Sequence, residues 1–186
     1  MRIIAGLAKG RKLVTPQGFH TRPTADRVRE ALFSVLLPQL PGAKVLDAFA
    51  GSGALGLEAL SRGAKLAHFI EKDTRCLEYL RHNVEHCCLP GAKIFSGDAI
   101  RFLRRSENKY DIIFLDPPYY TELLKQALTA ILQGDTLAGD GLIVAEVAKK
   151  ESFFIPDKFI KRKYSVYGNT ALCYLAYVDP NDVGIL

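Results

Sequence analysis

The sequence predicts an α/β fold in which a mostly parallel sheet carries helices on both faces. Between residues 43 and 147, short apolar runs alternate with segments of helical periodicity, a pattern typical of right-handed βαβ units. A glycine turn follows the first run, and two strand-like runs flank Gly168-Asn169. Because these last runs predict an antiparallel hairpin, the sheet should end differently from a plain dinucleotide-binding fold.

The first 40 residues precede this alternation. Two short apolar-rich segments, residues 2–5 and 11–14, predict a small hairpin. A helix is expected over residues 25–37, with Thr24 as its N-cap. Three arginines should lie near the start of this helix or on its other faces, free to meet a ligand: Arg22, Arg27 and Arg29.

The 186 residues suit a single domain, with a basic arm or hairpin at 1–23, a helix at 24–40 and a core at 42–178. Within the core, strands are predicted at 43–47, 66–71, 93–97, 110–115, 141–147, 158–167 and 170–178. Helices are predicted at 54–62, 74–87, 98–105 and 120–133.

Positive charge is concentrated at the start of the chain. The net charge is +5, yet residues 1–29 alone carry +6 and the remainder carries −1. Such a local excess suits a polyanion, most simply nucleic acid, although a solvated basic tail has the same sequence pattern. The candidate RNA-binding residues are Arg2, Lys9, Arg11, Lys12, Arg22 and Arg27.

The composition indicates a soluble cytoplasmic protein, which we expect to be a monomer. Apolar residues make up 48% of the chain and charged residues 24%, as in globular domains. No apolar run is long enough to span a bilayer, and residues 1–9 lack the pattern of a secretory signal. The four cysteines form no CxxC pair, so neither a zinc site nor a disulfide framework is expected.

The most informative stretch has the sequence KVLDAFAGSGALG and covers residues 44–56. It predicts a buried strand, a glycine turn and the start of a helix. Gly51, Gly53 and Gly56 have the GxGxxG spacing of nucleotide-cofactor folds, in which glycine lets the backbone approach the ligand closely. The sequence therefore predicts a nucleotide-like cofactor above the end of this strand.

Asp47 helps to separate two classes of cofactor. It directly precedes the turn, where a carboxylate would repel the pyrophosphate of a dinucleotide. S-adenosylmethionine has no phosphate and carries a sulfonium and an ammonium group, and opposite charges about 4 Å apart gain roughly 4 kcal/mol at an effective dielectric of about 20. The alternative is that Asp47 only caps the following turn or helix.

Further acids stand at three other predicted strand ends, Glu71, Asp98 and Asp116. In open α/β sheets, ligands lie beyond the carboxyl ends of the strands. Glu71 lies twenty residues after Gly51, where an acid commonly accepts hydrogen bonds from ribose hydroxyls of either cofactor. Asp98 suits an adenine contact and a helix N-cap about equally.

The segment Asp116-Pro117-Pro118-Tyr119 is the most specific signal. Two prolines in series make a stiff ledge at the end of an apolar strand. The carboxylate of Asp116 and the carbonyl of Pro117 can accept both hydrogens of a planar amine, which aims the nitrogen lone pair at a methyl donor. Tyr119 offers a ring for base stacking. The alternative is a tight turn with a surface aromatic.

These motifs resemble those of class I S-adenosylmethionine-dependent methyltransferases. Asp47-x-Phe49-x-Gly51-x-Gly53 is similar to the first motif of that class, and residues 116–119 are similar to its amino-methyltransferase motif. More narrowly, the chain resembles the RsmD family, which methylates the exocyclic N2 of a guanine in 16S ribosomal RNA. This narrower likeness lies chiefly in residues 2–6, 10–13, 21–33, 51–64, 71–73, 114–119 and 167–170.

The resemblance implies a Rossmann-like sheet of seven strands, the last of them antiparallel. It implies that S-adenosylmethionine, with S-adenosylhomocysteine as product and no metal, is bound by Asp47, Phe49, Ala50, Gly51, Gly53, Glu71, Lys72, Asp98 and Ala99. It places Asp116, Pro117, Pro118 and Tyr119 at the target amine. The implied partner is the RNA of the small ribosomal subunit, as an assembled particle.

Three alternatives stay open. An amino-methyltransferase acting on adenine or cytosine, in DNA or another RNA, would use the same proline ledge. An NAD-dependent dehydrogenase would share the glycine turn. A nucleic-acid-binding module with an inactive fold would not bind S-adenosylmethionine.

Overall fold

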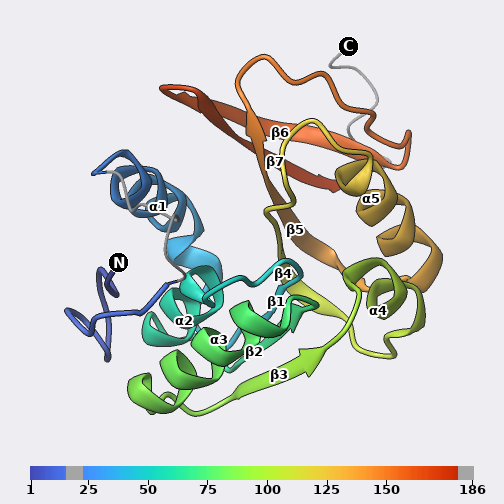
Figure 1. Ribbon diagram of the computed structural model, residues 1–186. Helices are drawn as coiled ribbons and strands as arrows, with labels where there is room; N and C mark the ends of the chain where they lie inside the picture. The colour runs from blue at the N-terminus through green and yellow to red at the C-terminus, as the bar shows by residue number, and fades with distance from the viewer. Residues whose placement is uncertain (16–22, 180–186) are drawn as a thin grey trace.

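The computed structural model describes residues 1–15 and 23–179, which form a sheet between two layers of helices (Figure 1). Within these residues, the sheet has seven strands in the order β3-β2-β1-β4-β5-β7-β6. The strands are β1 (Lys44–Asp47), β2 (Leu66–Glu71), β3 (Ala92–Ser96), β4 (Tyr110–Leu115), β5 (Leu137–Ala148), β6 (Phe159–Tyr167) and β7 (Thr170–Tyr177). Strands β1 to β5 are parallel, and β7 lies antiparallel between β5 and β6. The predicted fold class is confirmed.

Helices cover both faces of this sheet. One face carries α1 (Pro23–Leu36), the short 3-10 helix η1 (Leu37–Gln39), α2 (Ala54–Ser61) and α3 (Thr74–Cys87). The other face carries α4 (Ala99–Arg105) and α5 (Leu123–Gly134). No helix of the described residues is both long enough and apolar enough to cross a membrane.

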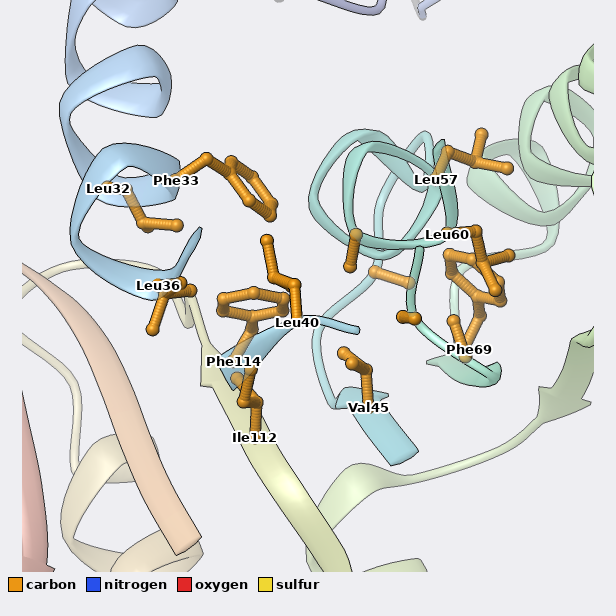
Figure 2. Close-up of a cluster of buried hydrophobic side chains, with 14 of the residues drawn as sticks. Leu32, Phe33, Leu36, Leu40, Val45, Leu57, Leu60, Phe69, Ile112 and Phe114 are labelled. Atoms are coloured by element: carbon orange, nitrogen blue, oxygen red, sulfur yellow. The ribbon is translucent and has the colours of Figure 1, made fainter. Parts of the chain in front are cut away.

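The central strands are apolar on both faces because each face is covered. In β4, Ile112 and Phe114 belong to the cluster under α1 and α2, shown in Figure 2, whereas Ile113 and Leu115 pack toward α4 and α5. The ring of Phe33 on α1 meets the ring of Phe114 edge-on, with centroids 5.8 Å apart. This double burial explains why the strand is a continuous apolar run in the sequence rather than an alternating one.

The glycine turn joins β1 to α2 beyond the end of the sheet. Gly51 and Gly53 have φ of +52° and +82°, which residues with a side chain rarely adopt. Gly56 lies inside α2, where an added Cβ would stand 2.3 Å from the ring of Phe69 on β2. The three glycines therefore serve two purposes, a left-handed turn and close packing of the helix on the sheet.

The N-terminal hairpin is less regular than predicted. Residues 2–5 and 11–14 are not strands, and only Arg2 and Lys12 form an isolated antiparallel bridge. We call residues 1–15 the arm. The buried carboxylate of Glu58 on α2 accepts hydrogen bonds from the backbone N–H groups of Ile4 and Ala5, at 2.7 and 3.0 Å. Core side chains thus hold part of the arm's backbone, other N–H groups pair within the arm, as Ile3 does with the carbonyl of Arg11, and the arm is a fixed part of the molecule.

Three predicted boundaries are wrong by two residues or more. Helix α1 begins at Pro23, so Thr24 lies inside the helix and not before it. Helix α5 begins at Leu123, because Tyr120 has φ of +58° and cannot continue a helix. Strand β5 begins four residues before the predicted start, at Leu137, which pairs with Tyr110.

The expectation that Arg29 is free to meet a ligand is also wrong. Its side chain is 6% exposed, and its guanidinium donates to the carbonyl of Arg2 and to the carboxylate of Asp26. Arg29 therefore fastens the arm to α1. Arg27 is exposed, as predicted, and Arg22 lies outside the described residues.

Candidate active site

A cavity of about 790 Å³ opens at the carboxyl ends of β1, β2 and β4. Strands β1 and β4 are parallel neighbours, so the glycine turn and the proline ledge come to the same end of the sheet. All but one of the predicted cofactor and catalytic residues line this cavity, namely Asp47, Phe49, Ala50, Gly51, Glu71, Lys72, Asp98, Ala99, Asp116, Pro117, Pro118 and Tyr119. Asp47 and Asp116, which are 69 residues apart in the chain, thus share one space.

Gly53 is the exception among the predicted residues. It precedes the first residue of α2 and does not line the cavity. A Cβ added there would lie 2.4 Å from Cδ1 of Leu80. Its contribution is to shape the turn and to let α3 pack against it.

Asp47 is a buried acid at the end of β1. Its carboxylate accepts a 3.0 Å hydrogen bond from the backbone N–H of Gly56. Burial raises the pKa of Asp47 from its ordinary value of 3.8 to about 7; the bond from Gly56 opposes this shift and the negative charge of Glu71 adds to it. A cation bound in the cavity would favour the ionised form and reverse the shift. Capping and cofactor binding are therefore compatible roles for this side chain.

Backbone N–H groups also hold the next two acids. Glu71 accepts from Gly51 at Oε2 and from Lys72 and Asp73 at Oε1, each at 2.8 Å. Asp98 caps α4 by accepting from the N–H of Arg101 at 2.9 Å. Asp98 nevertheless lines the cavity, so the two interpretations of this residue do not compete.

The ledge after β4 presents Asp116 to the cavity. Asp116 is exposed at the cavity, yet the density of protein around its carboxylate, followed by the charges of Glu146 and Asp47, raises its pKa well above the ordinary value. The hydroxyl of Thr121 donates to the carbonyl of Pro118 at 2.8 Å and closes the turn. An acid in this setting is a strong hydrogen-bond acceptor when it is ionised.

Two residues that the sequence analysis missed hold Tyr119. Its hydroxyl donates to Oε1 of Glu146 on β5 at 2.7 Å and lies 3.0 Å from Oγ1 of Thr170 on β7. Burial raises the pKa of Tyr119, and it also raises the pKa of Glu146. The available signal was that Glu146 is the only charged residue in the apolar run 141–148.

A second glutamate holds the backbone of the same loop. Oε1 of Glu151 accepts from the N–H of Tyr120 at 2.7 Å, and Oε2 accepts from the N–H of Ala148 at 3.1 Å. The ledge is therefore fixed by contacts with the end of β5 as well as by its two prolines.

The arm reaches the cavity from the α1 side. Met1 and Thr15 are among the lining residues. The candidate RNA-binding residues that the structure describes have exposed side chains: Arg2, Lys9, Arg11, Lys12 and Arg27. Arg11 also donates from Nη1 to the carbonyl of His86 at 2.7 Å, which ties the arm to α3. Among residues 1–15 and 23–179, no group of three or more His, Cys, Asp or Glu side chains is arranged to hold a metal ion.

Comparisons with known proteins agree with this architecture. A family model described as conserved hypothetical protein 95 matches residues 1–176. Ribosomal RNA small subunit methyltransferase D of Haemophilus influenzae is 37% identical over 172 residues, which are 90% of this chain and 89% of that protein. The protein of the same name from Escherichia coli is 42% identical over 146 residues, 78% of this chain and 74% of that one.

Solved structures give the same assignment. The structure described as putative methyltransferase yhhF from Escherichia coli has a TM-score of 0.86 at 37% identity, covering 95% of this chain and 97% of that chain. A putative methylase from Haemophilus influenzae has a TM-score of 0.81 at 32% identity, covering 96% and 98%. The chain therefore belongs to the conserved hypothetical protein 95 family, which is the family of ribosomal RNA small subunit methyltransferase D.

Proposed function

We propose that this protein transfers a methyl group from S-adenosylmethionine to the exocyclic N2 of a guanine in 16S ribosomal RNA. One observation carries the proposal: the acid that ends β1 and the ledge that follows β4 line the same cavity. A methyl donor and an amine react only when their atoms meet at about 3 to 3.5 Å. Neighbouring parallel strands supply that proximity.

The cofactor side of the cavity suits S-adenosylmethionine, whose electrophilic methyl group is the chemistry that it supplies. Asp47 would attract its cationic groups, and a pKa near 7 means that little energy is needed to ionise this acid at neutral pH. Glu71 keeps lone pairs for ribose hydroxyls beside its three backbone bonds. Phe49, Ala50, Gly51, Lys72, Asp98 and Ala99 complete the proposed cofactor site.

The acceptor side suits an aromatic amine. Asp116 and the carbonyl of Pro117 would accept the two N2 hydrogens and direct the nitrogen lone pair toward the methyl group. S-adenosylmethionine would supply the methyl group here, and the carboxylate of Asp116 would take the proton that the nitrogen releases as the methyl group is transferred. Because the pKa of Asp116 is raised, its carboxylate is a stronger base than an ordinary one. Tyr119 lies beside this position, and we propose that the base stacks on its ring.

The proposed substrate is the RNA of an assembled small subunit, acted on by a monomer. The names of the relatives above state small-subunit ribosomal RNA, which supports the RNA part of this proposal. The exposed cations of the fixed arm offer a docking surface for phosphates next to the cavity mouth. A base in an unpaired region of RNA is splayed out at little cost and can enter such a site.

The test is to incubate the protein with labelled S-adenosylmethionine and small subunits from cells that lack this enzyme, then to digest the RNA and identify the labelled nucleoside. We expect N2-methylguanosine at one position. Labelled N6-methyladenosine or N4-methylcytidine would establish one of the alternatives instead. Binding of NAD in place of S-adenosylmethionine in calorimetry would indicate a dehydrogenase, and binding of neither would indicate an RNA-binding module.

A further inference from the structure

Glu146 lies at the same level of the sheet as Asp116. In the parallel pair β4 and β5, Leu115 is in register with Ala145, so the next residues, Asp116 and Glu146, are neighbours. Phe114 and Val144, two residues earlier, share one hydrophobic cluster, and side chains two apart along a strand point to the same face. The charge of Glu146 acts directly on Asp116. The ledge therefore has a second carboxylate beside the first.

The two oxygens of Glu146 differ. Oε1 accepts from the hydroxyl of Tyr119, which also lies against Thr170, so the carboxylate is held in one orientation. Oε2 has no hydrogen-bond donor among residues 1–15 and 23–179. The side chain is only half-buried. One oxygen is thus fixed by the protein, and the other has no donor among these residues. Glu146 does not itself line the cavity, but it contacts Tyr119 and adjoins Asp116, which both do.

The nucleobases differ in the atom next to their exocyclic amine. Guanine presents a donor, N1–H, beside its N2 amine. Adenine and cytosine present a ring-nitrogen lone pair beside theirs. A carboxylate accepts hydrogen bonds only, so a second one next to the amine acceptor matches guanine and repels the other two bases.

We infer that Glu146 is the specificity-determining residue of the target-base site, and that its free oxygen accepts N1–H of guanine while Asp116 and Pro117 hold N2. The inference rests on the proposed function and names the residue that selects the base. A role in fastening Tyr119 alone does not explain the charge, because a neutral glutamine would accept the same hydroxyl bond. A half-buried carboxylate close to Asp116 carries a desolvation and repulsion cost that a donor on the substrate would relieve.

The test uses 2-aminopurine, which keeps the N2 amine of guanine and has a lone pair in place of N1–H. Small subunits are reconstituted with RNA that carries either guanosine or 2-aminopurine ribonucleoside at the methylated position. The wild-type protein should favour guanosine in kcat/KM by about 10- to 100-fold, the range for loss of one directed contact to a base edge. In Glu146→Gln, whose amide can donate to that lone pair, the ratio should fall by at least about tenfold.

Glu151→Gln is the matched control. It makes the same change in the neighbouring glutamate, which holds the N–H of Tyr120 and belongs to the same loop contact. It should shift both rates by one factor and leave their ratio unchanged. Thermal unfolding and calorimetry with S-adenosylmethionine check that each variant is folded and binds the cofactor. If Glu146→Gln does not fold, Glu146→Asp withdraws the carboxylate by one methylene, and the ratio should again fall.

An unchanged ratio in a folded Glu146 variant, with both rates lowered equally, would overturn the inference and leave Glu146 as a support for Tyr119. That result would leave the proposed function intact, because the wild-type product would still be N2-methylguanosine. A wild-type product on adenine or cytosine would overturn the proposed function first, and this inference with it.

Discussion

Backbone N–H groups hold the acids on the cofactor side of the cavity, whereas Asp116 and Glu146 on the acceptor side accept from no backbone N–H group of the described residues. Asp47 accepts from one backbone N–H and Glu71 from three. Glu146 accepts instead from the hydroxyl of Tyr119. Asp116 accepts from no donor among the described residues, although it lies beside two other carboxylates.

This difference follows from what each side has to receive. The cofactor is the same molecule in every turnover, so its site can be completed in advance by backbone geometry that costs nothing to reorganise. The substrate amine brings its own hydrogens, and a carboxylate whose lone pairs are already satisfied has little capacity for them. An unsatisfied Asp116 is therefore an acceptor that the substrate completes.

The largest expected effect is that of Asp116→Ala, which should impair the acceptor side of the cavity and leave the cofactor side intact. Loss of a preorganised polar group at the reacting atoms should lower kcat by about 10²- to 10³-fold. Affinity for S-adenosylmethionine, measured by calorimetry, should stay nearly unchanged because the backbone-held acids remain. Full activity in this variant would end the proposed mechanism, and loss of cofactor binding would show that the two sides are not independent.

The next prediction is that Asp47→Asn weakens the cofactor site and stabilises the fold. Since the folded-state pKa of Asp47 is about 7 and its ordinary value is 3.8, the native state binds the proton more tightly than the unfolded state. This acid therefore lowers the free energy of unfolding progressively as pH rises from about 4 to 7.

Without cofactor at pH 8, Asp47→Asn should unfold at a higher urea concentration than wild type, with a gain of about 2 to 4 kcal/mol. The difference should narrow toward zero as the pH approaches 4. Affinity for S-adenosylmethionine should fall in the same variant. An equal gain at every pH would mean that a cause other than ionisation of Asp47 is responsible.

A smaller effect concerns the pH dependence of methyl transfer. Only ionised Asp116 can accept both a hydrogen bond and the proton, so kcat should fall by about tenfold per pH unit below its pKa. Desolvation, Glu146 and Asp47 all raise the pKa of Asp116. The fall in kcat toward low pH, the acidic limb of the profile, should therefore begin well above pH 4. Glu146→Gln should move the limb to lower pH by removing one like charge. A limb that stays in place would show that Glu146 does not act on Asp116.

Sequence patterns predicted the motif residues and missed the residues that hold them. The glycine turn and the proline ledge are recognisable because their geometry is local, and alternating apolar segments predict the sheet. Glu146 contacts Tyr119 at a separation of 27 residues, and Glu58 contacts Ile4 at a separation of 54. Each looked like an ordinary acid in an apolar segment, because its partner is set by which strands and helices become neighbours.

The prediction for Arg29 was wrong for the same reason. At the start of a helix, in a basic stretch, it has the pattern of a phosphate ligand, yet it is buried against the carbonyl of Arg2. Charge counting located the basic region correctly but did not distinguish a cation that builds the arm from the cations that the arm displays.

The smallest expected effect tests whether the cations of the arm contact RNA phosphates next to the acceptor side of the cavity. Arg11→Gln with Lys12→Gln removes two exposed charges from a segment that Glu58 and Arg29 hold in place. If both contact phosphates, affinity for small-subunit RNA should fall several-fold, and the slope of log K against log salt should become shallower by about 0.7 to 0.9 per lost contact. The matched control is Arg104→Gln with Arg105→Gln, which removes two exposed charges from α4 on the other face of the sheet.

The control pair should leave the slope unchanged. Glu58→Gln refines the test, because it keeps every arm charge and replaces only the carboxylate that holds the backbone of Ile4 and Ala5. If a fixed arm is what matters, this variant should weaken RNA binding even though its cations are intact. If the slope in the Arg11 and Lys12 variant equals that of wild type, the arm is a solvated basic surface and the acceptor side ends at the cavity mouth.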